Sequence, residues 1–223
     1  MIVFSPAWQQ HKNIFHCTTT HSINLKDGDC TGFLNALGLS EEWKLVYVKQ
    51  VHGQDFIWVD HNVQTGCCGV ADALITSRSK VLLVIQTADC TPVLIEQDGI
   101  VAVVHAGWRG IANGIILKVL NELGGFERAL VGPLISKECY EVGLEVVEAI
   151  EAAGVPRSVF VHPHSNSEKA YVDVRAAAVW QLREGGSGTI DHIDRCTFKD
   201  PQLHSYRQKG AQAGRNFSCI GLH

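Results

Sequence analysis

The fold of this chain is decided by the stretch Gln86-Thr87-Ala88-Asp89-Cys90-Thr91-Pro92, which directly follows the apolar run of residues 81–85. A second apolar run, residues 100–104, ends as abruptly in His105-Ala106-Gly107-Trp108-Arg109-Gly110. Both runs are rich in β-branched residues and are closed by polar clusters. They therefore predict two neighbouring strands that deliver polar side chains at their ends.

These polar clusters supply residue types that bind metals. His52 follows a third apolar run, residues 45–48, so His52, Cys90 and His105 form a candidate set of one thiolate and two imidazoles. Three protein ligands with an open fourth position are typical of a catalytic zinc site. Copper accepts the same ligands, so the ligand types alone leave both metals open. The sequence predicts a catalytic metal centre, with zinc expected and copper as the alternative.

The composition indicates one folded domain of the α+β class. Hydrophobic residues make up 46% of the 223 residues, which is enough for a substantial core. No linker-like tract divides the chain, and strand-like runs arrive in groups separated by helix-like stretches instead of in regular βαβ alternation. We therefore predict a single layered domain over residues 1–223, with mixed β-sheets covered by a few helices.

The expected elements follow from the periodicity of apolar residues. Strands are predicted at residues 14–17, 44–48, 56–59, 73–75, 81–85, 92–96, 100–104, 129–131, 159–161, 190–193 and 219–221. Helices are predicted at residues 32–37, 114–123, 143–153 and 173–184. Four further side chains are predicted to be surface histidines: His16, His21, His162 and His164.

The charge and the N-terminal sequence restrict the class of protein. A formal net charge of -4 argues against a nucleic-acid-binding surface, because such surfaces need clustered Lys and Arg. The first residues lack the pattern of a signal peptide, and no apolar run approaches the roughly 20 residues of a membrane span. A cytoplasmic protein that binds no membrane is expected, with most of its eight cysteines reduced.

A set of ordered motifs resembles the laccase-domain, or polyphenol-oxidase-like, family. The motifs extend from about Asn24 to the end of the chain: Lys49-Gln50-Val51-His52-Gly53, Ala71-Asp72-Ala73-Leu74-Ile75-Thr76, Thr87-Ala88-Asp89-Cys90, His105-Ala106-Gly107-Trp108-Arg109-Gly110, Gly132-Pro133, Cys139-Tyr140-Glu141-Val142-Gly143, Ser205-Tyr206-Arg207 and Gly214-Arg215. The resemblance implies a layered fold with mixed sheets. It also implies zinc held by a His, Cys, His set, which corresponds here to His52, Cys90 and His105.

The same resemblance implies a multifunctional purine nucleoside enzyme. Members phosphorolyse adenosine, inosine, guanosine and methylthioadenosine, releasing the base and leaving phosphate on C1′ of the ribose, and they also deaminate adenosine. The expected ligands are therefore a purine nucleoside and phosphate. One departure from the family pattern is a shorter segment at residues 18–25, which puts the preference for a particular base in doubt.

Several side chains near the metal motifs are candidates for substrate binding. Arg109 lies in a Gly-flanked turn before a helix-like stretch, and its guanidinium suits a bidentate phosphate contact. Asp89, like Asp72, is either a turn residue or a group that orients a ligand or the substrate. The remaining candidates are the cations Lys49, Arg207 and Arg215, for which simple solvent exposure is the alternative.

Three other functions stay open at this point. A copper-dependent polyphenol oxidase would use the same motifs, but multicopper oxidases need more His ligands, and only His162-Pro163-His164 has the His-x-His form. Cys139 paired with His52 or His105 would suggest a Cys/His-dependent hydrolase. The chain could also be a metal-binding protein without turnover, and its oligomeric state is open.

Overall fold

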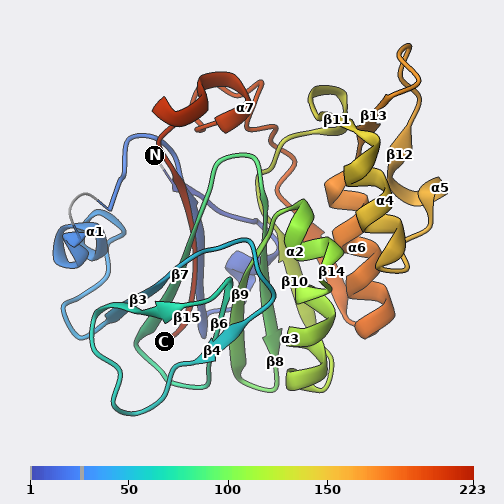
Figure 1. Ribbon diagram of the computed structural model, residues 1–223. Coiled ribbons are helices and arrows are strands. Elements are labelled where there is room, and N and C mark those ends of the chain that lie inside the picture. Colours follow the sequence, from blue (N-terminus) through green and yellow to red (C-terminus); the bar gives the residue numbers. More distant parts are fainter. Residues whose placement is uncertain (1, 26–27) are drawn as a thin grey trace.

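Two mixed β-sheets form the centre of the computed structural model, which describes residues 2–25 and 28–223 (Figure 1). The first sheet has the strand order β1-β2-β15-β7-β3-β5 and contains parallel and antiparallel neighbours. Its strands are β1 (Ile2–Val3), β2 (Ile14–Thr19), β15 (Asn216–Leu222), β7 (Val81–Thr87), β3 (Lys44–Lys49) and β5 (Gly66–Val70). The C-terminal strand β15 therefore lies in the middle of the sheet, beside β7.

The second sheet has the order β14-β10-β8-β9-β6-β4. Its strands are β14 (Thr189–His192), β10 (Arg128–Val131), β8 (Thr91–Gln97), β9 (Ile100–Ala106), β6 (Ala73–Thr76) and β4 (Phe56–Trp58). The hairpin β8–β9 pairs Thr91 with Ala106 at one end and Gln97 with Ile100 at the other. This register places the start of β8, next to Cys90, directly beside His105 at the end of β9.

The long apolar runs form strands that are buried on both faces. In β7, Leu83 and Ile85 pack between the two sheets, while the alternate residues Leu82 and Val84 pack on the outer face of the first sheet. In β9, Val103 lies in the same intersheet core, and its neighbours lie in a third core beneath the helices. Since successive side chains point to opposite faces, a strand covered on both sides requires an unbroken apolar sequence.

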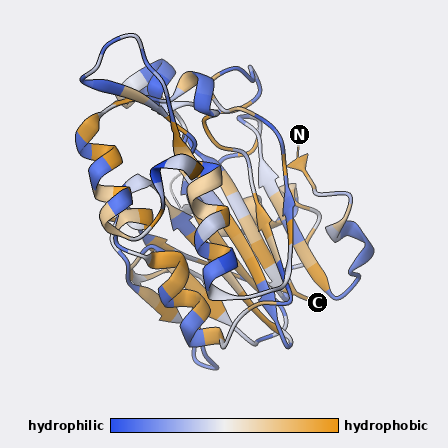
Figure 2. Cartoon of the chain, turned by 90° about the vertical axis from the view of Figure 1, so that its right-hand side faces the viewer, coloured by the Kyte–Doolittle hydropathy of each residue, from blue (hydrophilic) through white to orange (hydrophobic). Residues whose placement is uncertain are grey.

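Helices cover the outer face of the second sheet. They are α2 (Trp108–Ala112), α3 (Ile115–Leu123), α4 (Leu144–Ala152) and α6 (Val174–Gly185). Figure 2 looks onto this helical side and shows hydrophobic strands behind helices that carry both hydrophobic and hydrophilic residues. The helix α1 (Cys30–Ala36) covers the first sheet, where Phe33 and Leu34 join the outer core. Across the described ranges, no helix combines the length and hydrophobicity needed to cross a bilayer.

Short elements complete the fold, and among them β11 and β13 contact α4. A small sheet has the order β11-β13-β12, with β11 at Glu141–Gly143, β13 at Lys169–Val172 and β12 at Val161–His162. The remaining elements are α5 (Arg157–Phe160), α7 (Tyr206–Lys209), and the 3-10 turns η1 (Trp8–Gln10), η3 (Lys137–Cys139) and η4 (Gly210–Gln212). The predicted α+β class with mixed sheets is confirmed by this architecture.

One predicted strand is wrong, and the strands β1, β5, β11 and β13 were not predicted. Residues 159–161 lie mostly in the helix α5, which begins after Pro156, and only Val161 belongs to a strand. The unpredicted strand β5 has the sequence Gly-Cys-Cys-Gly-Val, which carries no apolar alternation. It forms because its backbone pairs in parallel with β3, a long-range contact that local sequence does not encode.

The prediction of a surface position is wrong for His16. This side chain in β2 is only 2% exposed, and its Nε2 atom accepts a hydrogen bond of 3.0 Å from the backbone N–H of Ser5. Rings of Phe4 and Trp8 pack against it at centroid distances of 5.8 and 5.6 Å. Burial lowers the pKa of His16 to about 4, so the folded protein contains the neutral imidazole.

This buried imidazole makes stability depend on pH. The unfolded chain takes up a proton near the ordinary pKa of 6.5, whereas the folded chain does so only near 4. The free energy of unfolding should therefore be highest above pH 6.5 and fall by about 3 kcal/mol as the pH decreases to 4. In His16→Gln, the amide oxygen can also accept a hydrogen bond from Ser5. Urea titrations of this variant should show a smaller decrease in the free energy of unfolding between pH 6.5 and pH 4.

The matched control is His61→Gln, because His61 is exposed. Its free energy of unfolding should decrease with pH as steeply as that of the unmodified protein over the same pH interval. Identical slopes for all three proteins would contradict the assignment of a buried neutral His16.

Candidate metal centre and substrate cavity

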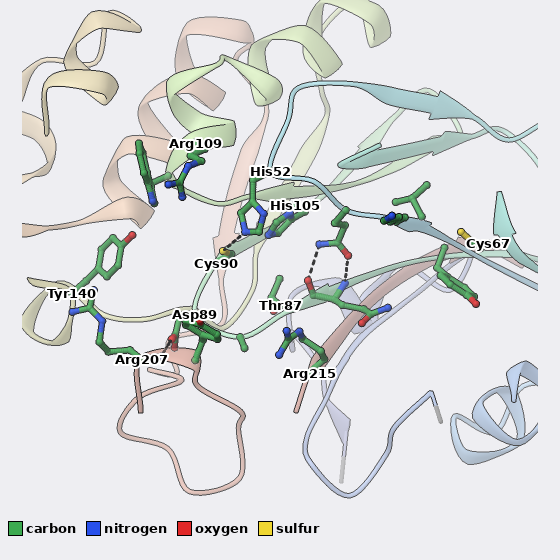
Figure 3. A pocket seen from close by; sticks show the side chains of 18 residues that line it. His52, Cys67, Thr87, Asp89, Cys90, His105, Arg109, Tyr140, Arg207 and Arg215 are labelled. Carbon is green, nitrogen blue, oxygen red and sulfur yellow. Dashed lines mark hydrogen bonds between the residues drawn. The ribbon is translucent and has the colours of Figure 1, made fainter. Parts of the chain in front are cut away.

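Three side chains converge where the ends of three strands meet. The ligand atoms of His52, Cys90 and His105 all lie within 4.8 Å of one another. His52 comes from the loop after β3, Cys90 from the turn between β7 and β8, and His105 from the end of β9. Figure 3 shows the imidazole of His52 pointing at the sulfur of Cys90, with an Nε2–Sγ distance of 4.0 Å. The structure thus brings together the three predicted ligands.

A buried carboxylate, that of Asp72, organises two of these residues. Its Oδ1 atom accepts hydrogen bonds from the backbone N–H of His52 at 3.0 Å and from Nδ1 of His105 at 2.8 Å. Its Oδ2 atom accepts from the backbone N–H groups of Val51 and Gly53 at 3.2 and 2.7 Å. The Asp72 side chain is fully buried. It therefore acts as an orienting group, which is one of the two roles left open by the sequence.

The loop that Asp72 binds is strained at the candidate ligand itself. His52 has φ of 59°, in the left-handed region that costs a non-glycine residue energy. Three successive N–H groups, those of Val51, His52 and Gly53, point at one carboxylate in this conformation. The hydrogen bonds to Asp72 offset the strain and fix where the imidazole of His52 lies.

The donor set fits a divalent metal ion. The hydrogen bond from Nδ1 to Asp72 leaves Nε2 of His105 as the ring atom free to bind a metal. Burial acts to raise the pKa of the Cys90 thiol, but hydrogen bonds and charges from His105 and His52 lower it to about 6. A thiolate is the form of cysteine that binds metals. Burial acts to lower the pKa of His105, but hydrogen bonds to Asp72 and Cys90 raise it to about 9, so metal binding would displace a proton from this imidazole.

Gly107 keeps the space beside the cluster open. A Cβ atom at this position would lie 3.0 Å from Sγ of Cys90 and 3.2 Å from Cδ2 of His52. Both contacts are closer than side chains normally tolerate. The backbone of the turn after His105 can therefore approach the cluster only because residue 107 has no side chain.

The cluster opens into a cavity of about 820 Å³. All eight residues predicted for the site line it: Lys49, His52, Asp89, Cys90, His105, Arg109, Arg207 and Arg215. The structure thus brings these eight side chains together around one cavity. The roles of the individual residues stay predictions.

Asp89 is bound to the protein on both carboxylate oxygens. Oδ1 accepts from the hydroxyl of Thr197 and Oδ2 from the backbone N–H of Arg207, each at 2.6 Å. Figure 3 shows Asp89 beside Arg207. Its backbone has φ of 92°, and its carbonyl accepts from the N–H of Ile135. Asp89 therefore connects the C-terminal segment to the turn that carries Cys90. This arrangement favours positioning over the direct substrate contact predicted from the sequence.

The cavity gathers positive charge. Among residues 2–25 and 28–223, no carboxylate lies within ion-pair distance of the four predicted cations. The guanidinium of Arg109 stacks on Trp108 at 4.2 Å, and that of Arg207 lies over Tyr140 at 5.2 Å. Arg215 donates only to the nearby carbonyls of Ala213 and Gly214. In a chain of net charge -4, such a group of cations without carboxylate partners among the described residues favours the binding of an anion.

Two features of the cavity were not predicted. The amide of Gln50 donates to the carbonyl of Gln86 and accepts from its N–H, both at 2.8 Å, so it ties the ends of β3 and β7 together. Tyr140 lines the cavity, and burial together with the charge of Cys90 raises the pKa of its hydroxyl. Gln50 lies two residues before His52 in the motif Lys49-Gln50-Val51-His52-Gly53. This position beside a predicted ligand was the feature of the sequence that could have indicated a structural role for Gln50.

Cys139 does not form the predicted pair with a histidine of the cluster. Its thiol interacts electrostatically with Cys196, and it is absent from the lining of the cavity. Both histidines are engaged elsewhere, since His105 bonds Asp72 and His52 faces Cys90. The geometry therefore gives no support to a Cys/His-dependent hydrolase.

Comparison with known proteins identifies relatives over most of the chain. The family described as multi-copper polyphenol oxidoreductase laccase matches residues 29–223. A Mycobacterium tuberculosis (strain H37Rv) protein named purine nucleoside phosphorylase is 37% identical over 195 residues, which are 84% of this chain and 75% of that protein. A prokaryotic protein named adenosine deaminase RL5 is 33% identical over 196 residues, 79% of this chain and 74% of that protein.

Solved structures share the fold. The Neisseria meningitidis protein NMB0706 has a TM-score of 0.81 at 26% identity and covers 100% of this chain and 98% of its own. The Bacillus licheniformis hypothetical protein YfiH has a TM-score of 0.87 at 21% identity, and the match covers 100% of this chain and 96% of that protein. The predicted family is confirmed by these comparisons, and the enzyme names of the sequence relatives confirm that this is an enzyme family.

The role of Asp72 leads to a prediction for metal affinity. In Asp72→Asn one carboxylate oxygen becomes an NH₂ group, which cannot accept from the N–H groups that face it. The His52 loop and the ring of His105 should lose their fixed positions, and zinc affinity should fall about 10- to 100-fold. Competition against a chromophoric chelator measures this affinity.

Asp60→Asn is the control, because the carboxylate of Asp60 caps only an exposed turn at Asn62. Its zinc affinity should stay within about twofold of the unmodified protein. An unchanged affinity in Asp72→Asn would show that the carboxylate does not organise the centre.

Proposed function

Because the chain belongs to the multi-copper polyphenol oxidoreductase laccase family, we propose that it is a metal-dependent enzyme acting on purine nucleosides. The proposed reaction is phosphorolysis of adenosine, inosine, guanosine or methylthioadenosine, with deamination of adenosine as a second activity. The relatives named purine nucleoside phosphorylase and adenosine deaminase support both reactions. Residues 1–223 would form a single domain that carries out this chemistry.

One observation carries the proposal: an open three-ligand cluster shares one cavity with four cations that have no carboxylate partner within the described part of the chain. His52, Cys90 and His105 would hold a zinc ion and leave a coordination position free. When bound, the metal would supply Lewis acidity and lower the pKa of a water molecule for attack at C6 of adenosine. The cations match the other co-substrate, since phosphate is an anion at neutral pH.

The residues of the chain have separable tasks in phosphorolysis. Arg109 and Arg207, each stacked on an aromatic ring, would bind phosphate and direct one of its oxygens at C1′ of the ribose. Trp108 and Tyr140 line the same cavity and present ring surface against which a purine can pack. Asp89 would keep the Arg207 segment against the turn that holds Cys90.

The alternative of a multicopper phenol oxidase is disfavoured by the ligands present. In the part of the chain that the structure describes, one group of three metal-binding side chains is found, and it is the His52, Cys90, His105 set. The His-x-His pair at His162 and His164 does not join it, because Nε2 of His164 bonds Glu141. A single three-ligand centre fits hydrolytic or phosphorolytic chemistry better than multicopper oxidation.

Metal analysis tests the centre. Protein purified without added metal should contain about one zinc per chain, since one thiolate and two imidazoles form a suitable site. Cys90→Ala should lose most of this zinc, whereas Cys68→Ala, which removes an exposed thiol of β5, should retain it. Elemental analysis of the three proteins gives the stoichiometry. Stoichiometric copper, or equal zinc in Cys90→Ala, would contradict the assignment.

The arginine at the cavity wall should separate the two activities. Arg109→Lys keeps the charge but loses the planar fork that binds phosphate through two hydrogen bonds. Its kcat/KM for phosphorolysis of adenosine should fall about 10- to 100-fold, which corresponds to about 1.4–2.8 kcal/mol. Deamination needs no phosphate and should change less than about threefold. Product analysis by liquid chromatography measures both rates in one sample.

The exposed Arg78→Lys serves as the control and should leave both rates unchanged. Equal losses of both activities in Arg109→Lys would assign Arg109 to nucleoside binding. Release of purine base that does not require phosphate would refute phosphorolysis itself.

A further inference from the structure

Seven cysteines lie outside the metal cluster, and their environments differ sharply. Cys17 and Cys219 face each other across β2 and β15, where both are buried. Cys67 and Cys68 are adjacent and exposed on the edge strand β5, and Cys30 is a buried residue of α1. The last two, Cys139 and Cys196, combine mutual contact with partial exposure.

The contact between these last two sulfurs is fixed by the backbone on both sides. Residue 196 forms an isolated β-bridge with Leu134, and the backbone N–H of Ser136 donates to Sγ of Cys196 at 3.3 Å. Cys139 closes the 3-10 turn η3, in which its own N–H donates to the carbonyl of Ser136 at 2.9 Å. The segments around residues 136 and 196 therefore lie side by side, and the thiols of Cys139 and Cys196 interact.

The two thiols are chemically unequal. Burial acts to raise the pKa of Cys196, but hydrogen bonding to its sulfur lowers it overall, and the backbone N–H of Ser136 donates to this sulfur at 3.3 Å. Burial raises the pKa of Cys139. The pair thus has one sulfur whose anion is stabilised by fixed donors and one that stays protonated, an arrangement suited to an attacking thiolate and a resolving thiol.

We propose that Cys139 and Cys196 form an oxidation site that takes hydroperoxides, of which hydrogen peroxide is the smallest, and that becomes a disulfide. The Cys196 thiolate attacks one peroxide oxygen, the O–O bond breaks, and hydroxide leaves to become water. The sulfur of Cys139 then attacks the resulting sulfenic acid, the S–O bond breaks, and a second water carries away the hydroxyl group with the proton of Cys139. Two thiols lose two electrons in total, and one peroxide is reduced to two waters.

The site lies directly behind the wall of the substrate cavity. Cys139 precedes Tyr140, which lines the cavity beneath Arg207, and Cys196 precedes Thr197, whose hydroxyl donates to Asp89. A disulfide would covalently join two segments that both contact Asp89, because the carbonyl of Asp89 also accepts from Ile135. This inference does not depend on which reaction the cavity supports.

The test uses the zinc-loaded full-length protein and limiting hydrogen peroxide. Remaining thiols are alkylated, and peptide mapping by mass spectrometry identifies the bonded pair. The Cys139–Cys196 disulfide should form first, with a mass loss of 2 Da that dithiothreitol reverses. Under the same exposure, Cys17 and Cys219 should stay alkylatable after unfolding, because the oxidant does not reach them.

Two variants separate the roles of the sulfurs. Cys139→Ser should leave a sulfenic acid on Cys196 that dimedone traps, whereas Cys196→Ser should react at residue 139 at least tenfold more slowly. The proposal is overturned if Cys67, Cys68 or Cys90 is oxidised before the pair, or if Cys139 joins a cysteine other than Cys196. It is also overturned if peroxide oxidises the exposed Cys67 while both members of the pair remain thiols. Near-ultraviolet circular dichroism confirms that each variant is folded.

Discussion

The site depends on the hydrogen bonds that converge on the carboxylate of Asp72. This buried anion accepts hydrogen bonds from three successive backbone N–H groups and from the ring of His105. It therefore positions the strained His52 loop relative to the strand that ends in His105. The backbone carbonyl of Asp72 also accepts from the N–H of His105. A buried charge with these donors is stable, whereas the same donors without it would be unsatisfied. The positions of both histidines follow from this contact.

A second set of contacts ties the rest of the cavity to Cys90. Asp89 binds Thr197 and the backbone of Arg207, and Gln50 joins the ends of β3 and β7. Segments more than a hundred residues apart in sequence therefore meet at the turn that holds the thiolate. The result is a rigid polar framework around a cavity whose cations have no carboxylate partners among the described residues, which is the electrostatic condition for binding phosphate.

Much of this arrangement could be predicted from the sequence, because doubly buried strands need long apolar runs and the runs end at the ligands. The strands β7 and β9 and the convergence of His52, Cys90 and His105 follow from that pattern. The strand β5, the helix α5 and the burial of His16 depend on tertiary pairing and packing that local composition does not contain. The same holds for the contact of Cys139 with Cys196, which brings together residues far apart in the chain.

X-ray absorption at the zinc edge of the purified protein tests most directly whether the three residues form an open metal centre. The account predicts one sulfur at about 2.3 Å, two imidazole nitrogens at about 2.0 Å and one further light atom that exchanges with added ligands. A spectrum without sulfur, with two or more sulfurs, or with four ligands that no added anion displaces would contradict it.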